Sequence, residues 1–257
     1  MLLVIDIGNT NTVLGLFDGE RLVANWRLVS SHTRTVDEYW IAVKLLCAEV
    51  GLTAEHLNGV AISSVVPDLT TSFQRMIRKY YRLEPLLIST RLDLGLQLLV
   101  DNPGEVGADR ICDVVAAKNQ YTPPLVVVDL GTATTFEVLD SNGDYIGGAI
   151  APGMITAAGE LFHKAAQLYK VELKPPDHLI GKNTREHLQT GIFLGHVAMI
   201  EGLIMRFQKE LRLPNLFVVT TGGFCEEITR NSDLIQVADP NLTLNGIRLI
   251  YERNRRN

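Results

Sequence analysis

The sequence has few cysteines, and none of them are paired. Cys47, Cys112 and Cys225 lie far apart and form no C-x-x-C motif. This spacing gives neither a disulfide framework nor the ligand pattern of a zinc site. We therefore predict that all three are reduced residues that pack as small hydrophobic side chains.

Clustered basic residues and long apolar runs are also missing. The net charge is −5, from 24 lysines and arginines against 29 aspartates and glutamates, and the only basic run is the C-terminal RNRRN. Nucleic-acid binding is not expected as the main activity, because neutralising phosphates requires clustered cations. No apolar run approaches the about 18 residues of a membrane span, and no basic stretch typical of a signal peptide opens the chain. We therefore expect a cytoplasmic protein with neither a membrane nor a nucleic-acid partner.

What the sequence does contain is an internal repeat. Residues 2–28 read LLVIDIGNTNTVLGLFDGERLVANWRL, and residues 125–150 read LVVVDLGTATTFEVLDSNGDYIGGAI. Each copy has an apolar strand ending in an acid, a glycine, a threonine-rich turn, a second strand and an Asp-Gly or Asn-Gly hairpin signal. The repeat predicts two similar halves, each opening with a three-stranded meander. The prolines in YTPPLVV, residues 121–127, favour domains at 1–120 and 121–257.

Helical and strand patterns alternate after each meander, which predicts an α/β protein. A helix is expected from a start signal at Thr35 to a stop at Gly51, and the stretch LTLNGIRLIYER at 242–253 is expected to form a closing helix. The apolar stripe predicted for the first of these helices consists of Tyr39, Ile41, Leu45, Leu46 and Val50.

The turn DIGNTNT at residues 6–12 is the first candidate for chemistry. Burying a carboxylate such as that of Asp6 is costly unless a positive group lies opposite. Backbone N–H groups and hydroxyls in such a turn can cradle a phosphate, and the acid can hold the accompanying Mg²⁺. The alternative is an ordinary hairpin in which Asp6 is a cap. The second copy, with Asp129, favours the phosphate site, because two acids facing each other across a cleft need a cation between them.

The stretch NPGEVGADRICDVVAA at 102–117 is the second candidate. A capping-box arrangement starts at Asn102, but the helix could instead begin nearer Gly107, and the sequence leaves both open. In either case Asp109 and Arg110 lie in the first turns of an apolar helix. A carboxylate there is stabilised by the helix N-terminus and by the adjacent cation, so it can accept a hydroxyl proton. The alternative is a capped helix with an Asp-Arg surface pair.

Taken together, the motifs resemble a known family. The paired acid-glycine-threonine loops and the glycine turn VVTTGGF at 218–224 resemble the actin, sugar kinase and Hsp70 ATPases. DIGNTNT, EVGADR, DLGTATT, GGAIAPG and TGG, in that order, resemble type III pantothenate kinases over essentially the whole chain. The resemblance implies a duplicated actin-like (ribonuclease H-like) α/β fold around a nucleotide cleft. It also implies a homodimer that phosphorylates pantothenate with ATP, the first step of coenzyme A biosynthesis.

The same resemblance implies individual roles. Asp109 is implied to be the proton acceptor, and Asp129 to hold a monovalent cation, K⁺ or NH₄⁺, while Mg²⁺ accompanies ATP. The residues implied to bind ATP are Asp6, Ile7, Gly8, Asn9, Thr10, Asn11, Thr12, Val13 and Thr132. The residues implied to bind pantothenate are Val100, Gly107, Ala108, Asp109, Arg110 and Thr184. Family members often carry an aromatic residue, commonly tyrosine, where this chain has Val100, which cannot donate a hydrogen bond.

Two other functions are alternatives to this one. A kinase of the same fold could act on another hydroxylated substrate such as a sugar, and EVGADR argues against it. A non-enzymatic accessory factor would not need cleft acids at 6, 109 and 129. His196, within an apolar helix, is predicted to be a core or interface residue. The small residues Gly191, Gly195, Ala198 and Gly202 permit close helix approach, either in the homodimer or inside the chain.

Overall fold

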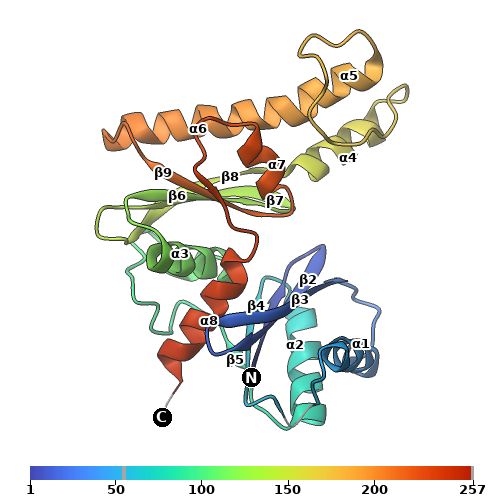
Figure 1. Ribbon diagram of the computed structural model, residues 1–257, viewed down its shortest axis with the longest axis vertical. Coiled ribbons are helices and arrows are strands. Elements are labelled where there is room, and N and C mark those ends of the chain that lie inside the picture. The colour runs from blue at the N-terminus through green and yellow to red at the C-terminus, as the bar shows by residue number, and fades with distance from the viewer. Residues whose placement is uncertain (54–55, 256–257) are drawn as a thin grey trace. The chain divides into compact units, whose positions relative to one another are not determined.

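The computed structural model describes residues 1–53 and 56–255, which form two compact units (Figure 1). Unit 1 contains Met1–Gln97, Asp101–Ala116 and the C-terminal residues from Leu242, and unit 2 contains Leu98–Val100 and Ala117–Asn241. Within the described residues each unit has one five-stranded mixed sheet. The two sheets have equivalent orders, β3-β2-β1-β4-β5 and β10-β9-β6-β7-β8. This equivalence confirms the predicted duplication of an α/β unit.

Unit 1 begins with the predicted meander. Its strands are β1 (Leu2–Ile7), β2 (Asn11–Asp18), β3 (Arg21–Val29), β4 (Gly59–Ser64) and β5 (Leu86–Leu87). Its helices are α1 (Val36–Glu49), α2 (Pro67–Met76) with the π-helical turn η2 (Ile77–Tyr81), the 3₁₀ turn η3 (Pro103–Glu105), the first turns of α3 (Ala108–Gln120), and α8 (Leu242–Asn254). β1 and β2 are antiparallel, whereas β4 joins β1 in parallel after the α1 crossover.

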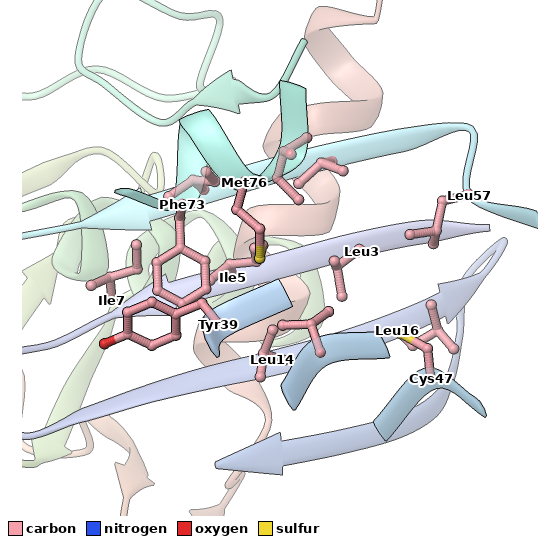
Figure 2. Close-up of a cluster of buried hydrophobic side chains, with 14 of the residues drawn as sticks. Leu3, Ile5, Ile7, Leu14, Leu16, Tyr39, Cys47, Leu57, Phe73 and Met76 are labelled. Atoms are coloured by element: carbon pink, nitrogen blue, oxygen red, sulfur yellow. The ribbon is translucent and has the colours of Figure 1, made fainter. Parts of the chain in front are cut away.

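The core of unit 1 lies between the sheet and helices α1 and α2 (Figure 2). Leu3, Ile5 and Ile7 alternate along β1 and point to this side. They meet Tyr39 and Phe73, whose ring centroids lie 4.6 Å apart. The strand that carries Asp6 is therefore held by a densely packed apolar face.

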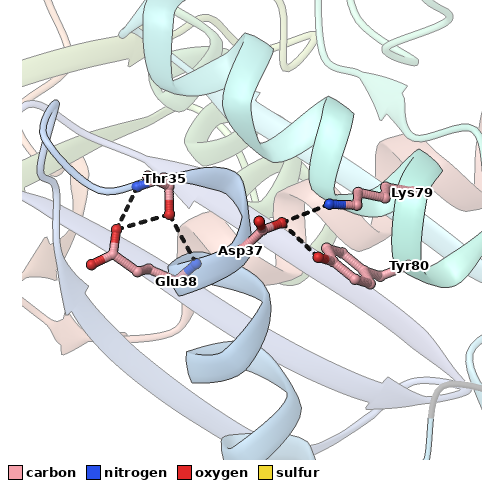
Figure 3. Close-up of polar contacts among 5 residues, drawn as sticks. All are labelled: Thr35, Asp37, Glu38, Lys79 and Tyr80. Carbon is pink, nitrogen blue, oxygen red and sulfur yellow. Dashed lines mark hydrogen bonds and ion pairs between the residues drawn. The ribbon is translucent and has the colours of Figure 1, made fainter.

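Helix α1 starts where the sequence predicts, but its buried face differs. Thr35 and Glu38 form a capping box, with the Thr35 N–H donating to Glu38 Oε2 at 2.7 Å (Figure 3). The buried residues are Tyr39, Val43 and Cys47, whereas Ile41 and Leu45 are 50% and 61% exposed. The predicted stripe was wrong at Ile41 and Leu45, which lie about 200° and about 240° around the helix from Tyr39, and at Val50, which is exposed and follows the last residue of the helix. Lys79 and Tyr80 bind Asp37 and join α1 to η2 (Figure 3).

The opposite face of the first sheet contacts α8. A Cβ on Gly246 of α8 would lie 2.0 Å from the Cys112 carbonyl oxygen, and one on Gly59 of β4 would lie 2.0 Å from the Tyr251 hydroxyl. This close packing places the C-terminal helix in unit 1. The division differs from the predicted one at residue 120, because α8 belongs to unit 1 and the boundary falls within α3, after Ala116.

Helix α3 resolves an alternative that the sequence left open. It begins at Ala108, directly after Gly107, and the preceding 3₁₀ turn receives no side-chain cap from Asn102. The capping-box interpretation at Asn102 was therefore wrong, and the start near Gly107 is confirmed.

Unit 2 repeats the plan of unit 1. Its strands are β6 (Leu125–Leu130), β7 (Ala133–Leu139), β8 (Tyr145–Pro152), β9 (Phe217–Gly222) and β10 (Val237–Ala238). Its helices include α4 (Met154–Lys164), α5 (Thr184–Gln189), the π-helical turn η4 (Thr190–Leu194), α6 (Gly195–Leu211) and α7 (Cys225–Arg230). Val126, Val128 and Phe136 form its core with Val197 and Ile200 of α6. As in unit 1, the central strand ends in an acid and is buried on its apolar side.

Among the described residues, the continuous helix Thr184–Leu211 is long and apolar enough to cross a membrane by length and composition. Its buried residues Phe193, Val197, Ile200 and Ile204, however, belong to the core of unit 2. His196 on the same helix is also buried, and its Nε2 lies 2.9 Å from Thr134 Oγ1, so of the two predicted alternatives, core or interface, the structure favours a buried position inside the chain. A Cβ on Gly191 or Gly195 would meet nothing within 4 Å, so in the described chain these two glycines leave open space instead of an internal helix contact.

Candidate active site

The turns after β1 and β6 have the same construction but different lengths. The Gly8 N–H donates to the Asn11 carbonyl at 3.0 Å, and the Gly131 N–H donates to the Ala133 carbonyl at 3.0 Å. The second turn is thus one residue shorter. Both tips are exposed, so the backbone groups of the two loops can meet a ligand.

Ser30 fixes the first loop, a role that no sequence pattern indicates. The Ser30 N–H donates to the Thr10 carbonyl at 3.0 Å, and Ser30 Oγ donates to the Gly8 carbonyl at 2.6 Å. Thr12 Oγ1 lies 2.9 Å from Ser30 Oγ, and because the single Ser30 hydroxyl proton is used, Thr12 is the donor. The side chains of Thr12 and Ile7 are fully buried, the latter in the core of unit 1. Within the predicted ATP set, these two side chains therefore shape the loop from behind.

Asp6 lies half-buried at the end of β1. Ser63, its register partner on β4, donates its hydroxyl to Asp6 Oδ1 at 2.9 Å. Ser63 was also missed by sequence reasoning, although a serine pair closing the apolar strand GVAISS is a usable signal. The carboxylate is therefore oriented from inside the sheet.

Asp129 occupies the equivalent place at the end of β6, beside the glycine turn of the TGG motif. A Cβ on Gly222 would lie 2.5 Å from Asp129 Oδ1 and 2.7 Å from the Leu130 carbonyl oxygen, and the Gly222 φ is +87°. Only glycine tolerates this combination of space and backbone conformation. The glycine of the TGG motif at position 222 therefore leaves the space that the Asp129 carboxylate and the Leu130 carbonyl occupy.

The GGAIAPG motif closes the second loop from another side. The Gly153 N–H donates to the Thr132 carbonyl at 3.1 Å, and Thr156 Oγ1 donates to the same oxygen at 2.7 Å. A Cβ on Gly153 would lie 2.3 Å from the Gly131 carbonyl oxygen. Thr132 is itself exposed, with its backbone fixed by these contacts.

Asp109 is held at the first turn of α3. Its Oδ1 accepts the Arg110 N–H at 2.8 Å, and a Cβ on Gly107 would lie 2.5 Å from the same oxygen. Gly107 therefore makes room for the carboxylate. Asp109 and Arg110 are half-buried, while Ala108 packs inside.

Cys112 shows that Asp6 and Asp109 belong to one region of unit 1. Burial raises the pKa of the Cys112 thiol well above its usual value, and the negative charges of Asp6, Asp113 and Asp109 raise it further. Asp113 is fully buried and accepts the Thr243 hydroxyl at 2.7 Å. Both predicted site acids therefore lie in unit 1, where their charges act on the same thiol.

The remaining predicted residues lie in unit 2. Val100 is half-buried, directly after Leu99, whose N–H donates to the Tyr145 carbonyl at 2.8 Å. Thr184 is exposed and begins α5, which Asn183 caps by accepting the Glu186 N–H at 3.0 Å. Within the described residues, no group of three or more histidines, cysteines and acids is placed to hold a metal ion.

Comparison with known proteins yields both relatives and a fold. A family model for type III pantothenate kinase matches residues 2–206. A type III pantothenate kinase of Roseiflexus castenholzii is 48% identical over 255 residues, covering 99% of this chain and 100% of that protein.

Solved structures show the fold at lower identity. A Campylobacter jejuni protein of the Baf family, described as a transcriptional activator, has a TM-score of 0.62 at 21% identity and covers 98% of each chain. The activator of a 2-hydroxyisocaproyl-CoA dehydratase from Clostridium difficile, solved with bound ADPNP, has a TM-score of 0.52 at 13% identity, with 98% and 95% covered. These likenesses confirm the predicted actin-like α/β fold.

Proposed function

This chain belongs to the type III pantothenate kinase family, and we propose that it transfers the γ-phosphoryl group of ATP to the primary hydroxyl of pantothenate. The observation that carries the proposal is the full-length relationship to type III pantothenate kinases. The reaction would form 4′-phosphopantothenate, the first step of coenzyme A biosynthesis. The positions of Asp6, Asp109 and Asp129 support it residue by residue.

Asp109 is the proposed acceptor of the pantothenate hydroxyl proton. Its carboxylate lies at a helix N-terminus and accepts the Arg110 N–H, which fixes its orientation. A fixed carboxylate can orient the hydroxyl toward phosphorus and take its proton as the new P–O bond forms. The bond between the γ-phosphorus and the ADP oxygen breaks, and the electron pair leaves with ADP.

The first loop is the proposed cradle for the ATP phosphates. Ser30 fixes the carbonyls of Gly8 and Thr10, so the loop needs little rearrangement on binding. Asp6 supplies carboxylate oxygens close to this loop, and such hard donors suit Mg²⁺. Mg²⁺ fits these residues, because the Asp6 carboxylate is a hard oxygen donor and a neutral hydroxyl, that of Ser63, orients it. Bound Mg²⁺ would neutralise charge on the phosphates.

In the second loop, Thr132 is proposed to contact ATP. Asp129 is proposed to hold a monovalent cation, K⁺ or NH₄⁺. Gly222 leaves no side chain between the Asp129 carboxylate and the Leu130 carbonyl oxygen. This all-oxygen surrounding fits a hard cation. A cation there would add positive charge near the phosphates.

Pantothenate is an anion with amide and hydroxyl groups, and the proposed residues match these features. Arg110 is the cation of the set and suits a carboxylate, while the exposed Thr184 hydroxyl can bond to an amide or carboxylate. Val100 offers an apolar wall only. The homodimer and the cytoplasmic location are likewise proposals, and the open glycine face of η4 and α6 supports close approach of a second copy.

The test is ADP release that depends on pantothenate. The purified protein with ATP and Mg²⁺ should release ADP when pantothenate is added in potassium buffer, and more slowly in sodium buffer. Sugars should give no release. Release with a sugar but not with pantothenate would instead establish another kinase of the same fold. No release with any hydroxylated substrate, together with binding of a partner protein, would indicate an accessory factor.

A further inference from the structure

Asp6 has a buried hydroxyl beside it that packing alone does not require. β1 and β4 are parallel, and Asp6 lies in register with Ser63. Ser63 is fully buried, and its hydroxyl donates to Asp6 Oδ1 at 2.9 Å. Ala61 precedes it by two residues and so lies on the same face of β4. An alanine at 63 would fill nearly the same space, so the serine adds an oriented donor.

Cys112 is a further neighbour of Ser63. The Cys112 side chain hydrogen-bonds with Ser63. Burial, reinforced by the charges of Asp6 and Asp113, raises the pKa of this thiol, so it keeps its proton. A hydroxyl has only one proton to give. That proton points at Asp6 Oδ1, so a protonated Cys112 thiol can only donate to Ser63 Oγ.

The second half has the same arrangement of residue types. β6 and β9 are parallel, and Asp129 lies in register with Thr221, which is also buried. Each loop acid is thus next to a buried hydroxyl residue on the neighbouring parallel strand. Burying a hydroxyl is costly without a partner, so its presence at both positions argues for a shared task.

We infer that Ser63, backed by Cys112, is a positioning residue that fixes the Asp6 carboxylate in the orientation in which it meets the Mg²⁺ of bound ATP. The inference rests on the proposed function for the role of Asp6. Without the hydroxyl, the carboxylate would lose one hydrogen bond that orients it, and nucleotide binding would have to restrict the added motion. Removing the Ser63 hydroxyl should therefore change how the rate depends on Mg²⁺ and ATP, and it should leave the affinity for pantothenate unchanged.

The experiment compares Ser63→Ala with Ser63→Thr, which keeps a hydroxyl as Thr221 does. The matched control is Ser64→Ala, which removes the adjacent hydroxyl on the same strand. Ser64 Oγ accepts from the Val66 N–H at 3.0 Å and from Thr70 at 2.6 Å, so this control loosens the start of α2 and leaves Asp6 alone. Each variant is assayed for kcat, for KM of ATP and of pantothenate, for the Mg²⁺ concentration giving half-maximal rate, and for Tm.

We expect Ser63→Ala to raise the half-maximal Mg²⁺ concentration or the KM for ATP about tenfold, as for loss of one hydrogen bond to a charged acceptor. Ser63→Thr should recover most of that change. Ser64→Ala should lower Tm and keep the Mg²⁺ and ATP dependence of the wild type. If Ser63→Ala keeps wild-type Mg²⁺ and ATP dependence, or if a folded Ser63→Thr recovers nothing, the inference is overturned.

A second pair of variants keeps the inference testable where Ser63→Ala does not fold. Cys112→Ala should raise the Mg²⁺ concentration giving half-maximal rate about threefold. Cys112→Ser retains a donor and should leave that concentration unchanged. An unchanged Mg²⁺ dependence in folded Cys112→Ala would then overturn the inference. Failure of the proposed function looks different. The wild type would then release no ADP with pantothenate, while Mg²⁺-dependent binding of ATP, measured by calorimetry, would still report the Ser63 effect on Asp6.

Discussion

Replacing Gly107 with alanine should move the Asp109 carboxylate without disturbing the fold around it. The added Cβ would lie 2.5 Å from Asp109 Oδ1, closer than real Cβ contacts allow, and 3.5 Å from Val65 Cγ1, which is an ordinary contact. The only neighbour that has to yield is therefore the end of a side chain. Gly107 also has no positive φ, so alanine brings no backbone strain there.

The size of the effect follows from that displacement. The carboxylate must turn away, and it loses the hydrogen bond from the Arg110 N–H. A hydrogen bond to a charged group contributes about 1.5–3 kcal/mol, and the half-buried site reduces this toward the lower end. A shift of about 1 Å in a catalytic group can cost about 100-fold in rate. We therefore expect kcat to fall about 100-fold while the free energy of unfolding falls by about 1–2 kcal/mol.

The assay is steady-state ADP release with saturating ATP, beside a thermal unfolding curve. Gly104→Ala is the matched control, since a Cβ there meets nothing within 4 Å and the residue precedes the same helix. The control should keep kcat and Tm, and Gly107→Ala should keep the KM for ATP within about twofold. A kcat near wild type in folded Gly107→Ala would refute the reasoning that Asp109 acts from this orientation.

Three further predictions follow from the same contacts. Asp109→Asn should lower kcat at least about 1,000-fold with unchanged ATP binding by calorimetry, because the amide cannot accept the proton; near wild-type turnover would contradict the role. Burial raises the pKa of the Cys47 and Cys112 thiols and raises that of Cys225 to about 11, so a thiol reagent at pH 8 should label the native protein slowly and should label all three thiols rapidly in denaturant. Rapid labelling of the native protein would show that the thiols are accessible. Burial lowers the pKa of His196, so as the pH falls below about 6.5 the unfolded chain takes up a proton before the folded chain does, and the free energy of unfolding decreases. Between pH 7.5 and pH 5, Tm should therefore fall less for His196→Gln than for the wild type. Equal losses of Tm would show that His196 does not contribute.

The sequence predicted most reliably where local chemistry and periodicity agree. The two meanders follow from hairpin signals and apolar runs, and the start of α1 follows from Thr35 and Glu38. The stripe of α1 failed at Ile41 and Leu45, because composition shows which residues are apolar but not which face meets the sheet. The capping-box pattern at Asn102 failed because a proline and a glycine suit a 3₁₀ turn as well as an α-helix.

Contacts between distant segments were beyond sequence reasoning. Nothing in the order of residues shows that Ser30 clamps the loop at Gly8, or that Ser63 reaches Asp6. Both serines depend on strand register, which is set by the whole sheet. The return of α8 to the first sheet likewise depends on Gly246 allowing close approach to Cys112, a contact between residues far apart in the chain.

The duplication also accounts for how two similar turns can take different tasks. The first turn has one residue more between its closing hydrogen-bond partners, and Ser30 holds it open from outside the turn. The second turn is shorter, and Gly153 and Gly222 bring neighbouring strands against it. A longer loop with exposed amides suits a bulky phosphate chain, whereas a short loop enclosed by carbonyl oxygens and one carboxylate suits a single cation. The difference of one residue thus supports giving the phosphates to the loop of Asp6 and the monovalent cation to the loop of Asp129.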